Sequence, residues 1–171
     1  MWRSVVTGVL VVGLLVGCGG TGRADSREQA ASGDGPRLSK RQYERAVAEI
    51  IESQPVREAD RLFFKLAAGD VTADECTTET GRFVRDVGSG IDAVARLNPP
   101  LEVAGLQARI VVAGRESQRQ LQQLAEDVAA GKVSCGPQWN RRAYGLPSTD
   151  RAVAILAEYA RRGYLIATNG E

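Results

Sequence analysis

Histidine is absent from this chain, and the net charge is close to zero. The 171 residues include no His, and 22 basic and 21 acidic residues leave a formal charge of +1. The lack of imidazole excludes Ser-His-Asp and Cys-His catalysis, zinc sites with His ligands and imidazole-ligated haem. It also removes the commonest general acid or base at neutral pH. The balanced charge argues against a nucleic-acid-binding protein, which would carry a basic surplus.

The remaining composition is that of an ordinary globular chain, with 43% hydrophobic and 25% charged residues. An apolar run stands at the N-terminus, where residues 5–16 are apolar apart from one Thr and two Gly, and Arg3 gives the segment a positive start. This run is too short to cross a bilayer as an ordinary helix, and it fits the hydrophobic region of a signal peptide. It ends in Leu15-Val16-Gly17-Cys18.

These four residues resemble the lipobox of bacterial lipoproteins: an aliphatic residue, a small or aliphatic residue, a small residue and then Cys. The resemblance covers the first 18 residues only. It implies that Cys18 receives a diacylglyceryl group and that residues 1–17 are removed as a signal peptide. Acyl chains that bury CH₂ groups at about 0.8 kcal/mol each would hold a soluble domain at a membrane. The alternative is an ordinary secretory signal in which Cys18 carries no lipid.

Residues 18–37 are expected to form the lipid anchor and a flexible tether. Residues 19–37 contain no large apolar side chain, so burial cannot offset the entropy of ordering them. Nineteen residues of this kind reach about 25 Å root-mean-square, enough to lift a domain off the lipid headgroups. Residues 38–171 would then form the folded domain.

Four segments of that domain have apolar residues spaced three and four apart, which predicts helices. They span about 39–68, 73–97 and 101–130, and the fourth starts at 148. No segment alternates apolar and polar residues over a sustained run, so we expect no sheet. The short connections between the first three segments favour antiparallel neighbours. The predicted fold is all-α, an up-down antiparallel bundle of about four helices.

Local residues mark where these helices begin and break. Ser39 with Gln42, and Thr72 with Glu75, form capping boxes at two helix starts. Pro55 should kink or split the first helix, because it lacks an N–H and clashes one turn back. In the fourth segment, the residues expected to face inward are Val153, Leu156, Ala157, Ala160 and Tyr164.

Two cysteines test this topology. Cys76 begins the second segment, and Cys135 follows the end of the third. Antiparallel helices bring these two points to the same end of a bundle, and export would expose them to an oxidising compartment. We therefore expect a Cys76–Cys135 disulfide that staples the domain. Two free buried thiols are the alternative. A catalytic thiol is disfavoured because no His could activate it.

The connection 131–147 is the longest between the predicted helices. Loops of this length are often functional or disordered. It contains Trp139, Arg141, Arg142 and Tyr144, a mixture of aromatic and Arg side chains that is enriched at binding hot spots. Either these residues bind a partner, or the two aromatics pack over the end of the bundle with the arginines in solvent. The second interpretation is favoured, since a loop near a disulfide needs packing of its own.

An acidic cluster, Asp70, Asp74, Glu75 and Glu79, lacks the spacing and central Gly of an EF-hand. Most of these acidic residues lie near a helix N-terminus, where negative charge interacts favourably with the helix dipole. We therefore expect no metal site and no cofactor beyond the covalent lipid on Cys18.

Three hypotheses for the function follow. The first is a non-enzymatic, lipid-anchored binding module on the outer face of a bacterial cell membrane, or on an outer membrane if there is one, with an envelope protein or ligand as partner. The overall pattern is similar to that of uncharacterised small helical lipoproteins of GC-rich bacteria. The second is a carrier or sensor that holds a small apolar or anionic ligand between helices. The third is an acid/base enzyme, which would need two carboxylates in one cleft, whereas the acids here mostly mark helix starts or solvent faces.

Overall fold

The computed structural model describes residues 35–146 and 148–166. Within them the chain is all-helical, with six helices and no strand. The helices are α2 (Lys40–Ile51), α3 (Gln54–Ala68), α4 (Ala73–Ala95), α5 (Leu101–Ala129), α6 (Pro137–Tyr144) and α7 (Ser148–Arg161). The expected signal peptide, Cys18 and the tether as far as residue 34 lie outside the described residues.

Both expected capping boxes are present. The Ser39 hydroxyl accepts from the backbone N–H of Gln42, whose side chain accepts from the Ser39 backbone, and Thr72 and Glu75 do the same at the start of α4. Each box satisfies two of the backbone N–H groups that a helix start leaves without an intrahelical partner. These local sequences therefore fix where α2 and α4 begin.

The first expected helix is split into α2 and α3. The break falls at Glu52 and Ser53, and Pro55 stands in the first turn of α3. A proline is tolerated there because the N–H it lacks would have no intrahelical partner. The Ser53 hydroxyl closes the corner by donating to the Ile50 carbonyl at 2.6 Å.

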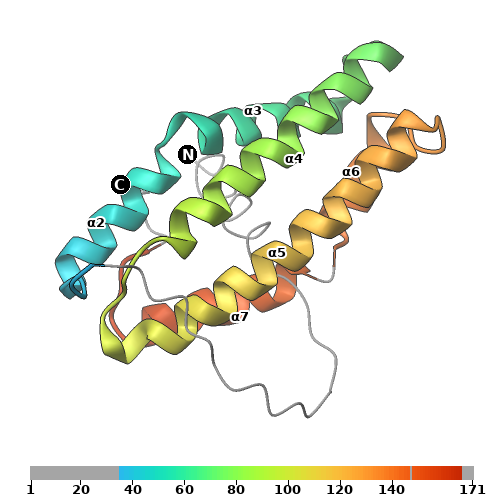
Figure 1. The fold of residues 1–171 in the computed structure, drawn as a ribbon. Coiled ribbons are helices and arrows are strands. Elements are labelled where there is room, and N and C mark those ends of the chain that lie inside the picture. Colours follow the sequence, from blue (N-terminus) through green and yellow to red (C-terminus); the bar gives the residue numbers. More distant parts are fainter. Residues whose placement is uncertain (1–34, 147, 167–171) are drawn as a thin grey trace, which may run out of the picture.

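The two longest helices, α4 and α5, form an antiparallel hairpin through the middle of the molecule (Figure 1). The shorter helices pack at its two ends. α3 lies against α4, and α6 contacts α3 and the end of α5. At the other end α2 packs against α4, and α7 packs against the first half of α5. Because of the break at Ser53, the two halves of the first predicted helix pack at opposite ends of the hairpin.

The core follows most of the apolar stripes that the sequence predicts. Its largest fully buried side chains come from every helix, since they include Tyr43, Leu62, Phe83, Leu121, Trp139 and Tyr159. Tyr43 of α2 and Tyr159 of α7 stack at 6.3 Å between ring centroids, and their hydroxyls lie 2.9 Å apart. Burial raises the pKa of both tyrosines, that of Tyr43 to about 12. Both hydroxyls therefore stay protonated at neutral pH and can share this hydrogen bond.

The inward face of α7 was predicted incorrectly in part. Ala157 and Ala160 are exposed, while Ile155 and Tyr159 are buried. Leu156 is half-buried, Tyr164 is buried as expected, and the side chain of Val153 lies outside the described residues. Alanines discriminate poorly between core and surface, because exposing a single methyl group costs little. The larger Ile and Tyr side chains decide the rotation of this helix.

The expected connection 131–147 contains the short helix α6 instead of a continuous loop. Its start is set by Gly136 and Pro137, with the proline in the first turn. The eight residues carry too few apolar positions to give a helical pattern in the sequence, and Trp139 and Ala143 are the ones that become buried.

Candidate functional site

Cys76 and Cys135 form the expected disulfide, with their Cα atoms 5.8 Å apart. Two glycines allow two segments of the chain to approach each other closely there. Gly69 (φ 79°) and Gly136 (φ 102°) both occupy the left-handed region, and a Cβ on Gly69 would lie 2.9 Å from the Gly136 Cα. The Gly136 N–H donates to the Leu66 carbonyl at 2.7 Å. The bridge therefore ties the start of α4 to the segment that leads into α6.

Trp139 is part of the core and has no accessible surface. Its ring packs edge-on between Phe63 and Phe83, with centroids 5.5 Å from each. The indole N–H donates to the Thr80 hydroxyl at 3.2 Å, and Thr80 is itself fully buried. For this residue the packing interpretation is confirmed.

The other three residues of the predicted binding loop lie on the surface of α6. Arg142 is tied to the domain, because its guanidinium donates to the Asp127 carboxylate at 2.6 Å and that carboxylate is largely buried. Arg141 is exposed, and the half-exposed ring of Tyr144 lies 6.3 Å from that of Phe63. α6 thus presents Arg141 and part of Tyr144 to solvent, while Trp139 and Arg142 hold it in place.

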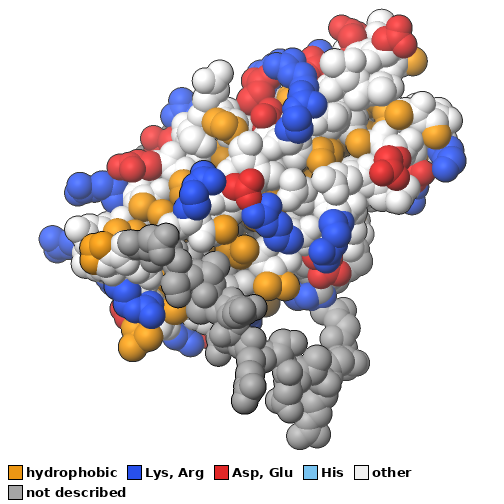
Figure 2. All heavy atoms as spheres, viewed as in Figure 1, with side chains coloured by type: hydrophobic (Ala, Val, Ile, Leu, Met, Phe, Trp, Pro, Cys, Tyr) orange, Lys and Arg blue, Asp and Glu red, His pale blue; other side chains and the backbone are white. Residues whose placement is uncertain are grey.

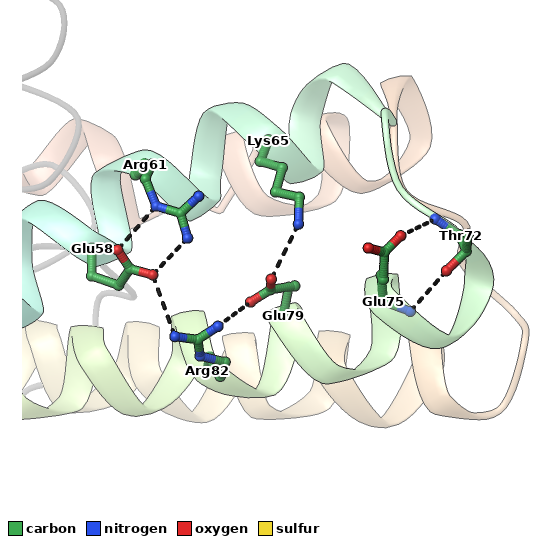
Figure 3. A network of polar contacts seen from close by, with 7 residues as sticks. All are labelled: Glu58, Arg61, Lys65, Thr72, Glu75, Glu79 and Arg82. Carbon is green, nitrogen blue, oxygen red and sulfur yellow. Dashed lines mark hydrogen bonds and ion pairs between the residues drawn. The ribbon is translucent and has the colours of Figure 1, made fainter.

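Glu75 and Glu79, in the first two turns of α4, make contacts that stabilise the fold. Figure 3 shows Glu75 completing the Thr72 capping box and Glu79 between Lys65 and Arg82, at 3.1 and 2.9 Å. The backbone N–H of Thr72 lowers the pKa of Glu75. Glu58 joins the same network through Arg61 and Arg82 (Figure 3), and the hydrogen bond from Arg61 lowers its pKa. In the part of the chain that the structure describes, no group of three His, Cys, Asp or Glu side chains could hold a metal ion.

A groove of about 530 Å³ lies between α5 and α7. One face of each helix lines it, with positions 105, 108, 109 and 112 on α5 and positions 151, 154, 155 and 158 on α7, each set spaced three and four apart. The floor is made of small and apolar side chains, and a Cβ on Gly105 would meet no atom within 4 Å. The full lining is Gly105, Ala108, Arg109, Val112, Ala113, Arg151, Ala154, Ile155, Glu158 and Arg161.

The rim of the groove is positively charged. Arg109 pairs with Glu158 across it, and Arg162 also holds Glu158 at 2.8 Å. These contacts, the Arg109 hydrogen bond first, lower the pKa of Glu158, so the carboxylate stays ionised. Arg151 has only a 4.0 Å contact to Glu116, and its buried Nε has no partner. The rim thus has one carboxylate, held by Arg109 and Arg162, while Arg151 keeps unused hydrogen-bonding capacity.

An apolar floor beneath guanidinium groups suits an amphiphile with an anionic group, because the guanidinium fork matches carboxylate and phosphate geometry. Among the described lining residues, Glu158 is the one side chain of a common nucleophilic kind, and it is ion-paired. The groove is not predicted by the sequence, because the inward face of α7 lies one position away from the face that the apolar spacing predicts. The repeated small residues at 105, 108 and 154 could have indicated it.

Asp60 is the carboxyl away from the groove with the largest rise in pKa. Burial raises the pKa of Asp60 on α3 to about 6, and its Oδ1 is buried without a hydrogen-bond partner. A single carboxyl without a second acid or a nucleophile is not an active site, so we treat Asp60 as a determinant of stability.

The charged side chains do not form a field of one sign on the face shown in Figure 2, where basic and acidic groups are interspersed. Among the described residues no helix is both long and apolar enough to cross a membrane. No family model matches the chain, and neither a curated protein nor a solved structure matches it.

Proposed function

We propose that this protein is a lipid-anchored lipoprotein of the bacterial cell envelope that acts as a non-enzymatic binding module. The lipobox Leu15–Cys18 supports the anchor, and it implies an address on the outer face of the cell membrane, or on an outer membrane where one exists. The Cys76–Cys135 bridge supports export, because structural disulfides persist in oxidising compartments. Nothing in the charge balance favours a nucleic acid as partner.

The domain in this proposal is an up-down bundle of four segments, in which α2 and α3 together form the first. The principal packing pairs support it, since α3 packs on α4, α4 on α5 and α5 on α7.

The single observation that carries the binding role is the groove between α5 and α7. It combines an apolar floor with the guanidinium groups of Arg109, Arg151 and Arg161 in a volume within the usual range of ligand sites, about 300–1,000 Å³. We assign the binding role to the groove and not to the exposed Arg141 and Tyr144 of α6, because the groove combines a hollow with apolar and cationic side chains.

The anchor is tested by the non-reduced mass of the protein purified from its native membrane. We expect a mass that lacks residues 1–17, carries acyl chains on Cys18 and is two hydrogens lighter because of the disulfide. A full-length mass without lipid would refute the anchor, and free thiols would refute the argument for export.

The groove favours a second candidate function, the carriage or sensing of a small amphiphilic anion. A long-chain fatty acid such as oleate is a suitable probe, with the amine of equal chain length as control. A ligand that binds the folded state raises the melting temperature. We expect oleate to stabilise the wild type and Gly81→Leu but not Gly105→Leu.

Gly105→Leu fills the groove, because a side chain at that position enters open space, whereas Gly81 lies outside the groove on α4 and its added Cβ meets nothing closer than 3.8 Å. An equal shift in the two variants would remove the groove as the ligand site. An equal shift with the amine would show that the Arg rim contributes nothing. Crosslinks from Val112 to an envelope protein, without any effect of oleate, would favour the macromolecular partner.

A further inference from the structure

The chain enters the domain at one particular end of the α4–α5 hairpin. The Leu38 N–H donates to the Asn98 carbonyl at 2.9 Å, and Arg37 donates to the Pro99 carbonyl at 3.2 Å. The Asn98 side chain also donates to the Gly35 carbonyl. In Figure 1 the start of α2, the turn between α4 and α5 and the end of α7 gather at the lower left. Whatever precedes residue 35 therefore joins the domain beside this turn.

The segment after α7 closes the same end. The Tyr164 hydroxyl donates to the Glu102 carboxylate at 2.6 Å, and Arg162 donates to the Glu102 carbonyl. The Leu165 N–H donates to the Glu44 carboxylate at 3.0 Å. These contacts place Leu165 and Leu101, the sequence neighbours of Tyr164 and Glu102, at one end of the molecule.

Leu101 and Leu165 are the most exposed large hydrophobic side chains among the described residues. They are 73% and 71% exposed, against 67% for Val112 in the groove and 46% for Phe64 near the opposite end. A single exposed leucine is common on protein surfaces. Two of them beside the point where the tether joins the domain indicate a contact surface. Leu101 is the first residue of α5 and Leu165 follows α7, so both lie at the same end of the hairpin.

Both cationic and acidic groups lie near these leucines. Arg37 and Lys40 are exposed, and Lys40 lies 5.0 Å from the Tyr164 ring centroid. The carboxylates of Glu44 and Glu102 accept hydrogen bonds from Leu165 and Tyr164, and Arg162 is paired with Glu158. A lipid surface offers phosphate groups above an apolar layer, so it can accept Arg37 and Lys40 beside the two leucines.

We propose that this end of the domain rests on the lipid bilayer, with Leu101 and Leu165 in the headgroup–acyl boundary and Arg37 and Lys40 toward lipid phosphates. The inference rests on the proposed anchor at Cys18. The 16 residues 19–34 are polar and rich in Gly. Chain statistics for a Gly-rich sequence of that length give about 22 Å root-mean-square between its ends. The 23 residues of α4 separate the two ends of the domain by about 35 Å. The anchor therefore favours contact through the near end.

The test introduces a photo-crosslinking benzophenone residue at one position at a time in the full chain. Positions 101 and 165 probe the proposed surface, while positions 144 and 64, 51% and 46% exposed and outside the groove, are controls. The protein is reconstituted in vesicles of phosphatidylglycerol and phosphatidylcholine, and crosslinked lipid is detected as an added mass on the chain. We expect lipid adducts at 101 and 165 at least fivefold above those at 144 and 64.

Three outcomes would overturn the proposal: no adduct at any position, equal adducts at all four, or adducts at 64 alone. Leu165→Asp should reduce the adduct at position 101 without changing the melting temperature, because the side chain it replaces makes little contact with the core. A chain that lacks acyl groups by mass refutes the anchor by itself. Its Cys18 thiol can then be coupled to a maleimide lipid, and the same four positions decide whether this end meets the bilayer.

Discussion

Removing the Cys76–Cys135 disulfide should cost about 4 kcal/mol of unfolding free energy. The perturbation is the double variant Cys76→Ala, Cys135→Ala. The sequence separation of the two cysteines is 59, and for a closed loop of that size the chain-entropy model gives about 4 kcal/mol. Alanine is chosen because Cys76 is buried, and a serine there would add an unpaired hydroxyl to the core.

The loss is large against a typical domain stability of about 5–15 kcal/mol. For a urea m-value near 2 kcal/mol/M it moves the midpoint by about 2 M. Unfolding is followed by the fluorescence of Trp139, which is buried between Phe63 and Phe83 in the folded state. The m-value should rise, because the chain without the bridge exposes more surface when it unfolds.

Wild-type protein unfolded in the presence of a reductant is the control, and it should lose a similar amount. A loss under about 1 kcal/mol in both experiments would refute the reasoning. It would mean that the residues enclosed by the bridge are already compact in the unfolded ensemble, so that the bridge removes little conformational entropy.

Three further predictions concern single side chains. Thr80→Val should cost about 1–3 kcal/mol in urea unfolding, because it leaves the buried Trp139 N–H without its acceptor, and an unchanged midpoint would contradict that hydrogen bond. Gly105→Ala should raise the unfolding free energy by about 0.5–1 kcal/mol in thermal melts, since the new Cβ meets open space. Gly90→Ala is its matched control and should gain less, because its Cβ would lie 3.1 Å from a core methyl group. Asp60→Asn should stabilise the domain at pH 7 by about 1 kcal/mol, allowing for partial solvent exposure. The folded pKa of Asp60 is raised to about 6, so the wild type loses stability as pH rises from about 4 to 6. The advantage of the variant should therefore vanish below about pH 4, and an advantage that persists there would refute the assignment.

The disulfide could be predicted because it depends on few tertiary details. Antiparallel neighbours joined by short connections bring the start of one helix near the end of the next, whatever their crossing angle. Cys76 and Cys135 occupy two such points, and the structure joins them. The capping boxes at Ser39 and Thr72 were equally predictable, since their hydrogen bonds run between residues three apart.

The candidate site could not be predicted, because it depends on how α7 is rotated about its own axis. A shift by one position replaces Leu156 and Ala160 by Ile155 and Tyr159 at the inner face, and the sequence of α7 supports either choice. The contact of Tyr159 with Tyr43, 116 residues away in the chain, decides between them. The sequence favoured packing for Trp139 but could not name its partners, since its acceptor and its aromatic neighbours come from α3 and α4.

The sequence by itself determined that this domain is helical, where most helices begin, that Pro55 interrupts the first, and which cysteines pair. Those features follow from the apolar spacing, from residues a few positions apart, and from helix connections too short to allow other neighbours. Only the tertiary structure decided that α2 and α3 pack at opposite ends of the α4–α5 hairpin, that Trp139 enters the core, and that a basic groove opens between α5 and α7. Each of these depends on which side chains fill a shared volume, and residues far apart in the sequence set that volume together.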